Sequence, residues 1–122
     1  MTKTILIVDD SISIRQVVGM TLKGAGFNVI EACDGRDALS KCDGRKLNLI
    51  ISDVNMPNMD GISFVSELKK QSSYRFTPVI MLTTEGSEDK KAAGKAAGAK
   101  AWVVKPFKAE QMLDAVNKLI LP

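Results

Sequence analysis

The side chains best suited to chemistry in this sequence stand directly after short apolar runs. They are three carboxylates, a hydroxyl and an amine: Asp9, Asp10, Asp53, Thr83 and Lys105. Carboxylates at close range repel one another, by on the order of 4 kcal/mol for a pair at about 4 Å and an effective dielectric constant of 20. Such a cluster needs a raised carboxyl pKa or a bound cation. An oxygen ligand set of this kind suits Mg²⁺, which often binds phosphate as well.

Together these groups indicate a Mg²⁺-assisted phosphoryl-acceptor site. A carboxylate nucleophile, a metal, an amine and a hydroxyl suffice for phosphoryl transfer, because that reaction needs mainly positioning and charge stabilisation. Lys105 would stabilise the charge of the phosphoryl oxygens, and Thr83 could donate a hydrogen bond to one of them. Each residue alone could equally be a turn or cap residue, so the hypothesis rests on their common location.

The elements that must position these residues alternate between β-type apolar runs and segments of helical period. Several runs are continuously apolar, as expected for strands covered on both faces. The strand candidates are Thr4–Val8, Asn28–Ala32, Leu49–Ser52, Val79–Leu82 and Ala101–Val104. This pattern predicts one doubly wound α/β domain, a (βα)₅ fold with a five-stranded parallel sheet, over residues 1–122. Ligands of such sheets bind at the carboxyl ends of the strands, where the polar residues would meet.

Four of the five expected helices have clear apolar stripes. Gly26 ends the first helix, a turn at Asp34-Gly35 precedes the second, and Asp60 is a plausible N-cap for the third. The stripes consist of Ile14, Val17, Val18, Leu22 and Ala25, then Ala38, Leu39 and Cys42, then Ile62, Val65 and Leu68, and finally Met112, Leu113, Val116, Leu119 and Ile120.

The fourth helix, around residues 87–98, has the weakest pattern. Its apolar face would consist only of alanines, namely Ala92, Ala93, Ala96 and Ala97. Gly94 in its interior costs about 1 kcal/mol relative to alanine. We expect either a shallowly docked, mobile helix or a close-packed Ala/Gly helix.

Composition excludes several classes of protein. The chain has 122 residues, a net charge of +3 and no histidine, so zinc sites and Ser-His-Asp catalysis are excluded. Cys33 and Cys42 form no disulfide framework, and we expect both to be buried or half-buried. No apolar run approaches the roughly 20 residues of a membrane span, and no signal peptide fits, which predicts a cytoplasmic protein without membrane insertion.

The sequence resembles the receiver domain of two-component response regulators along its whole length. The motifs that support the resemblance are Asp9-Asp10-Ser11, the segment from Asp53 to Gly61 (DVNMPNMDG), Thr83-Thr84 and Lys105-Pro106-Phe107. The family implies the strand order 2-1-3-4-5 and a cis bond before Pro106. It implies further that Asp53 accepts phosphate from a histidine kinase, that Asp10, Asp53 and the backbone carbonyl of Asn55 bind Mg²⁺, and that Asp9 contributes through water.

The resemblance also assigns the residues that would transmit and time a signal. Lys105 would contact the phosphoryl group, Thr83 would be the switch hydroxyl, and Trp102 occupies the switch-aromatic position, where the family more often has Tyr or Phe. Asn55 and Glu85 occupy the two positions that tune phosphate lifetime, in the manner of chemotaxis receivers that dephosphorylate themselves rapidly. The family thus implies a protein that promotes its own phosphorylation and dephosphorylation without being a conventional enzyme.

We therefore expect a CheY-like, single-domain chemotaxis regulator that has no output domain and is a monomer. It would bind a target, such as a flagellar switch protein, through the face of its fourth helix, fifth strand and fifth helix. A phosphatase partner is compatible with this role. The alternatives are a phosphate sink or a phosphorelay intermediate.

Two other classes of protein fit less well. A flavodoxin-like cofactor binder would need a phosphate-binding loop where Asp9 and Asp10 stand. Direct nucleic-acid binding is not expected, because Lys90, Lys91, Lys95, Lys100 and Lys108 lack an accompanying helix-turn-helix or aromatic platform. These lysines would more readily attract an acidic partner peptide.

Overall fold

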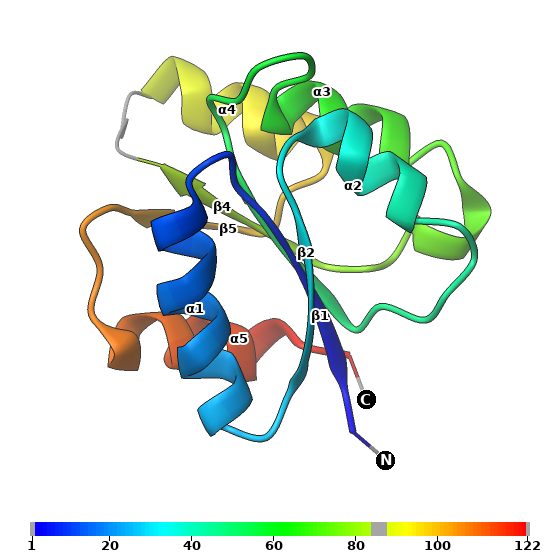
Figure 1. Ribbon diagram of the computed structural model, residues 1–122. Coiled ribbons are helices and arrows are strands. Elements are labelled where there is room, and N and C mark those ends of the chain that lie inside the picture. The colour runs from blue at the N-terminus through cyan, green and yellow to red at the C-terminus, as the bar shows by residue number, and fades with distance from the viewer. Residues whose placement is uncertain (1, 84–87, 122) are drawn as a thin grey trace.

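A five-stranded parallel sheet lies between two layers of helices in the computed structural model, which describes residues 2–83 and 88–121. The strand order is β2-β1-β3-β4-β5, as predicted. Helices α1 and α5 cover one face of the sheet, and α2, α3 and α4 cover the other (Figure 1). The elements are β1 Thr4–Val8, α1 Ile12–Gly24, β2 Asn28–Ala32, α2 Gly35–Lys41, β3 Leu49–Asp53, α3 Gly61–Leu68, the 3₁₀ turn η1 Ser72–Tyr74, β4 Val79–Thr83, α4 Glu88–Ala97, β5 Ala101–Val104 and α5 Ala109–Leu119.

The central strands divide their apolar side chains between two cores. Alternate residues of β3 point to opposite faces of the sheet, so Ile50 packs with α2 and α3 while Leu49 and Ile51 pack with α1 and α5. All five residues of β3 and of β4 are buried. Burial on both faces explains why these strands read as continuously apolar.

Side-chain caps begin three of the helices at the carboxyl edge of the sheet. Ser11 accepts a hydrogen bond from the Ile14 N–H at 3.3 Å. Asp34 accepts a hydrogen bond from the Asp37 N–H at 2.8 Å, and Asp60 accepts one from the Ser63 N–H at 2.7 Å. Helix starts are therefore fixed close to the loops that contain the polar residues.

Two strand ends differ from the prediction by one residue. Asp53 and Thr83 are the last residues of β3 and β4, because the parallel ladder continues to the pairs Asp53–Leu82 and Thr83–Val104. The side chains of Asp53 and Thr83 consequently have the fixed orientation of strand residues.

The predicted apolar face of α4 was wrong at three of its four residues. Ala92, Ala93 and Ala96 are exposed, and Ala97 is partly buried against the core, whereas Gly94 is buried against the sheet. A Cβ atom on Gly94 would lie 2.8 Å from Cζ3 of Trp102, so the helix approaches β5 through the residue that has no side chain. The hydrophobic pattern failed because alanine and glycine differ too little in apolarity to orient a helix.

Smaller departures concern α1 and the cysteines. Val17 and Ala25 face solvent, so the buried face of α1 is narrower than the predicted stripe. Cys42 is buried as expected, and burial raises the pKa of its thiol to about 11. Cys33 is exposed, contrary to prediction, because it lies in the loop just past the end of edge strand β2. No helix in the described part of the chain is long and apolar enough to cross a membrane.

Candidate phosphoryl-acceptor site

Three carboxylates meet where β1 and β3 end. Each of Asp9, Asp10 and Asp53 offers one oxygen, and these oxygens all lie within 4.8 Å of one another. Opposite ligands of an octahedral Mg²⁺ ion, each at about 2.1 Å, stand about 4.2 Å apart, so the cluster has a suitable size and donor chemistry. Asp10 is exposed, whereas Asp9 and Asp53 are buried. The site is therefore open to solvent on one side.

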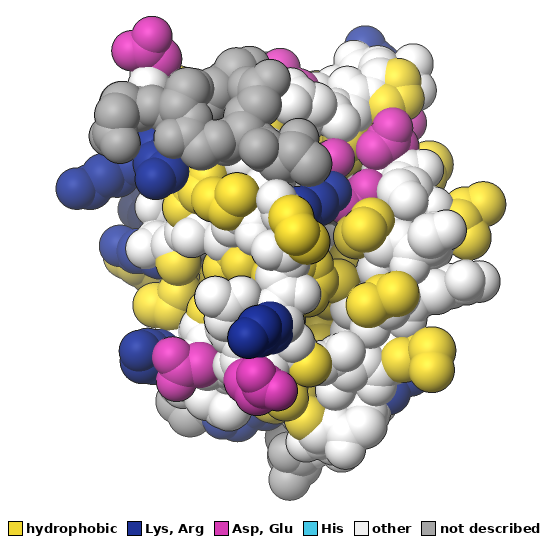
Figure 2. Space-filling view, turned by 90° about the vertical axis from the view of Figure 1, so that its left-hand side faces the viewer, with side chains coloured by type: hydrophobic (Ala, Val, Ile, Leu, Met, Phe, Trp, Pro, Cys, Tyr) yellow, Lys and Arg dark blue, Asp and Glu magenta, His cyan; other side chains and the backbone are white. Residues whose placement is uncertain are grey.

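Lys105 offsets part of the repulsion among the carboxylates. Its Nζ lies 3.0 Å from Asp9 Oδ2 and 3.6 Å from Asp53 Oδ1. The side chain reaches the pocket from the segment after β5, where the predicted cis bond to Pro106 is present. The Lys105 backbone N–H donates to the Thr83 carbonyl at 2.7 Å, which ties this segment to the end of β4. In the upper right of Figure 2, beside the grey atoms, several acidic side chains lie next to a basic one.

Asp53 is an ionisable group in an unfavourable position for its charge. Burial, and then the negative charge of Asp9, raise the pKa of Asp53 above its ordinary value, against the opposing effects of Lys105 and the Val54 N–H. That N–H donates to Asp53 Oδ1 at 2.9 Å. One oxygen of Asp53 is thus oriented by the backbone, in a pocket that favours neutralisation of the carboxylate.

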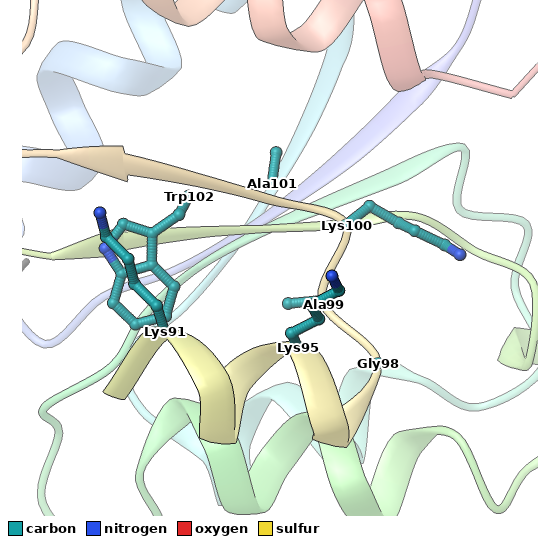
Figure 3. Close-up of a pocket in the computed structure, with 7 residues that line it drawn as sticks. All are labelled: Lys91, Lys95, Gly98, Ala99, Lys100, Ala101 and Trp102. Carbon is teal, nitrogen blue, oxygen red and sulfur yellow. The ribbon is translucent and has the colours of Figure 1, made fainter. Parts of the chain in front are cut away.

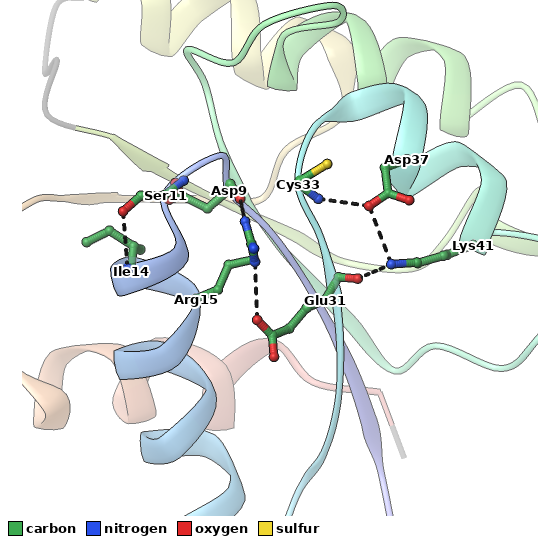
Figure 4. Close-up of polar contacts among 8 residues, drawn as sticks. All are labelled: Asp9, Ser11, Ile14, Arg15, Glu31, Cys33, Asp37 and Lys41. Carbon is green, nitrogen blue, oxygen red and sulfur yellow. Dashed lines mark hydrogen bonds and ion pairs between the residues drawn. The ribbon is translucent and has the colours of Figure 1, made fainter.

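Asp9 is held by hydrogen bonds to its side chain and to its backbone carbonyl. Its Oδ1 accepts a hydrogen bond from the Ser11 N–H at 2.9 Å, and its carbonyl accepts one from the Arg15 guanidinium (Figure 4). Arg15 also lies 3.2 Å from Glu31 of β2. No sequence motif includes Arg15, although its place one turn into α1 could have suggested contact with the strand end.

A close contact between Gly61 and the backbone of Asp53 fixes the position of this strand end. Gly61 begins α3, and a Cβ atom there would stand only 2.0 Å from the Asp53 carbonyl oxygen. The Gly61 N–H donates to the Val54 carbonyl at 2.8 Å. The segment 54–60, which contains Asn55, therefore leaves β3 and returns to it within one closed loop.

The remaining predicted residues lie at or near the same edge. Thr83 is fully buried at the end of β4. Trp102 is half-buried on β5, opposite Met81. Its Nε1 atom is the buried polar side-chain atom that lacks a hydrogen-bond partner within residues 2–83 and 88–121. Asn55 is exposed in its loop. Glu85, the second lifetime position, lies outside the described residues.

Known proteins match this chain over nearly its whole length. The model of the response regulator receiver domain matches residues 5–117. The structure of chemotaxis protein CheY4 of Vibrio cholerae is 51% identical, covers 98% of this chain and 100% of that one, and has a TM-score of 0.95. Protein PilG of Pseudomonas aeruginosa is 38% identical over 93% of this chain and 84% of that protein.

A third comparison bears on the metal. The receiver domain of sensor histidine kinase PA1611 from Pseudomonas aeruginosa, solved with a magnesium ion coordinated in its active-site cleft, is 25% identical, covers 98% of each chain and has a TM-score of 0.90. Other curated relatives are longer, and this chain spans about half of their length. The fold, the motifs and these matches show that the chain belongs to the response regulator receiver domains of two-component signalling.

Proposed function

We propose that Asp53 accepts a phosphoryl group from a histidine kinase, with Mg²⁺ held by Asp9, Asp10, Asp53 and the backbone carbonyl of Asn55. The observation that supports this most directly is the convergence of three carboxylate oxygens within 4.8 Å. Asp9 would contribute through water, while the exposed Asp10 would bind the metal directly. The metal would neutralise charge on the phosphoryl oxygens and on the carboxylates.

The transfer forms one bond and breaks one. A carboxylate oxygen of Asp53 attacks phosphorus, a P–O bond forms, and the P–N bond to the donor imidazole breaks with its electron pair leaving on nitrogen. Asp53 Oδ1 is already engaged by the Val54 N–H, so the other oxygen is the more available nucleophile. Lys105, 3.6 Å from Oδ1, is near enough to stabilise the transferred group.

Phosphorylation of an Asp53→Asn variant tests this assignment. With a small phosphoryl donor and Mg²⁺, we expect wild type to acquire one acyl phosphate, which is labile in strong acid and in base, and Asp53→Asn to acquire none. Asp43→Asn is a matched control, because Asp43 is exposed and pairs only with Arg45 in the described residues. An acyl phosphate that persists at wild-type yield in Asp53→Asn would place the acceptor elsewhere.

The phosphorylated protein would signal through the face formed by α4, β5 and α5. A hollow of about 450 Å³ lies there between α4 and β5 and is lined by Lys91, Lys95, Gly98, Ala99, Lys100, Ala101 and Trp102 (Figure 3). Lys91 lies beside the indole, and Lys95 and Lys100 lie further along the hollow (Figure 3). An indole with several lysines nearby suits an acidic segment that contains an apolar anchor. Thr83 and Trp102 would transmit the change from the pocket to this face. The similarity to chemotaxis protein CheY4 supports a chemotaxis-type role, with a flagellar switch protein as the candidate target.

Binding to a flagellar switch peptide would separate signalling from the alternative roles. We expect beryllofluoride, which mimics the phosphoryl group, to strengthen binding of the peptide, and Asp53→Asn to abolish that response. A protein that transfers its phosphate to another histidine and ignores the peptide would be a phosphorelay intermediate. The absence of an output domain and the monomeric state stay predictions, which full-length expression and light scattering would check.

A further inference from the structure

The loop of residues 54–60 has a tip that is tied to a different part of the chain. At this tip the Met59 N–H donates to the Pro57 carbonyl at 2.7 Å, which closes a three-residue turn around Asn58. Asn58 has φ = +67° and is the one non-glycine residue with positive φ in the described chain. A γ-turn with this sign of φ is rare and strained, so the surrounding structure must stabilise it.

Asp34 supplies that support from the loop between β2 and α2. Its Oδ2 accepts a hydrogen bond from the Asn58 side-chain amide at 2.8 Å, while its Oδ1 caps α2 at the Asp37 N–H, also at 2.8 Å. The neighbouring Gly35 N–H donates to the Met59 carbonyl at 3.1 Å. Asp34 is only 7% exposed. These hydrogen bonds, from Asp37 first and from Asn58 second, hold its pKa below the ordinary value, so it is ionised and a strong acceptor.

We propose that Asp34 is a positioning residue for the Mg²⁺ site, acting through Asn58 on the loop that supplies the Asn55 carbonyl. The loop is closed at its base by the Gly61–Val54 hydrogen bond and at its tip by Asp34 and Gly35. Between these ties lies Asn55, whose side chain is exposed. Since the base is fixed by backbone alone, the shape of the intervening segment depends on the tie at the tip. This inference rests on the proposed Mg²⁺ site.

The test compares two serine substitutions at the start of α2, one at its N-cap and one in its first turn. Asp34→Ser keeps an oxygen that can cap α2 but removes the second oxygen that reaches Asn58. Asp37→Ser is the matched control: it removes the same charge from the same helical turn, where Asp37 accepts a hydrogen bond from the Cys33 N–H and pairs with Lys41 (Figure 4). Asn58→Gly removes the amide while allowing positive φ.

Titration of ¹⁵N-labelled protein with MgCl₂, followed by amide chemical shifts, gives the dissociation constant of each variant. We expect Asp34→Ser and Asn58→Gly each to weaken Mg²⁺ binding by about tenfold, the lower end of the usual effect of outer-shell partners. The double variant should be no weaker than either single variant, because both remove the same contact. Asp37→Ser should bind as wild type does.

A conservative variant provides a rescue. In Asp34→Asn the side-chain oxygen can still cap α2, and its amide can donate to Asn58 once the Asn58 amide turns over. We expect this variant to recover most of the affinity. Unchanged dissociation constants in Asp34→Ser and Asn58→Gly, with a lower melting temperature, would show a purely structural role and overturn the inference. If wild type and Asp10→Ala both fail to bind Mg²⁺, the proposed function fails instead.

Discussion

Two glycines allow close approach in two regions of this molecule, with different consequences. Gly61 lies against the backbone carbonyl of Asp53, and Gly94 lies against the indole ring of Trp102. A backbone group within a five-stranded sheet cannot move without disturbing its neighbours, whereas a side chain can change rotamer. The acceptor pocket is therefore built on a fixed contact. The face of α4 and β5 is built on an adjustable one, beside an indole N–H that lacks a partner in the described structure.

The largest effect is expected for Gly61→Ala. Its Cβ would stand 2.0 Å from the Asp53 carbonyl oxygen, so the strand end or α3 must shift. We expect a loss of about 3 kcal/mol in the free energy of unfolding, the upper part of the range for overpacking. Urea unfolding would measure it. Gly24→Ala is the control: Gly24 is the last residue of α1, and a Cβ atom there would meet no atom within 4 Å, so we expect a gain of at most about 1 kcal/mol. Equal effects of Gly61→Ala and Gly24→Ala on the free energy of unfolding would show that the contact between Gly61 and Asp53 is not fixed.

Mg²⁺ should stabilise the protein through Asp10. At a hundredfold excess over its dissociation constant, a ligand of the native state adds about 2.7 kcal/mol. We expect Asp10→Ala to abolish this gain, yet to raise the stability of the metal-free protein by relieving repulsion from Asp9 and Asp53. Melting temperatures with and without Mg²⁺ give both quantities, and Asp114→Ala serves as an exposed-carboxylate control. A metal-free Asp10→Ala protein less stable than wild type would assign this carboxylate a structural role.

The fixed pocket should also have a distinct pH dependence. Because the pKa of Asp53 is raised in the folded protein, its contribution to stability is complete below the unfolded value of 3.8 and is lost as pH rises through the folded value. The side chain of Asp53→Asn does not ionise, so this variant does not lose stability at this position as the pH rises. We expect the metal-free variant to be more stable than wild type at pH 7, by a difference that shrinks as the pH falls toward 3.8. Urea unfolding across pH would show it, and a constant difference would contradict it.

The smallest effect on stability is expected for Gly94→Ala. Helix propensity gains about 1 kcal/mol, which offsets much of the overpacking cost of about 1–3 kcal/mol against Trp102. The ring can leave the contact, so we expect it to move toward solvent. Hydrogen exchange of the indole N–H should then become faster than in wild type. Slower or unchanged exchange, with a loss of stability as large as that of Gly61→Ala, would make this contact as fixed as the other.

Sequence patterns sufficed where burial and motif agree. The short apolar runs, several of them continuous, located all five strands, and the residues at their ends located the carboxylates, Thr83 and Lys105 at one edge. The order of the strands came from the family resemblance. Periodicity could not orient α4, because its buried position is Gly94, where a larger residue would overlap the ring of Trp102.

Contacts between distant loops were beyond sequence reasoning for a different reason. Asp34 was interpreted only as part of a turn, and nothing in the spacing to Asn58 indicated a hydrogen bond between them. Such a pair depends on how two loops meet above the sheet. The positive φ of Asn58 was likewise hidden, although asparagine is among the residues that tolerate it.

Trp102 is the single tryptophan of the chain, and it lines the same hollow as Lys91, Lys95 and Lys100. Indole emission is sensitive to nearby charge and to water, so the wild-type protein contains its own optical probe at the face proposed for partner binding. No dye or engineered residue is needed to follow occupancy there. A titration with a candidate acidic peptide could be read directly from the shift in emission wavelength, in the same sample in which beryllofluoride is added.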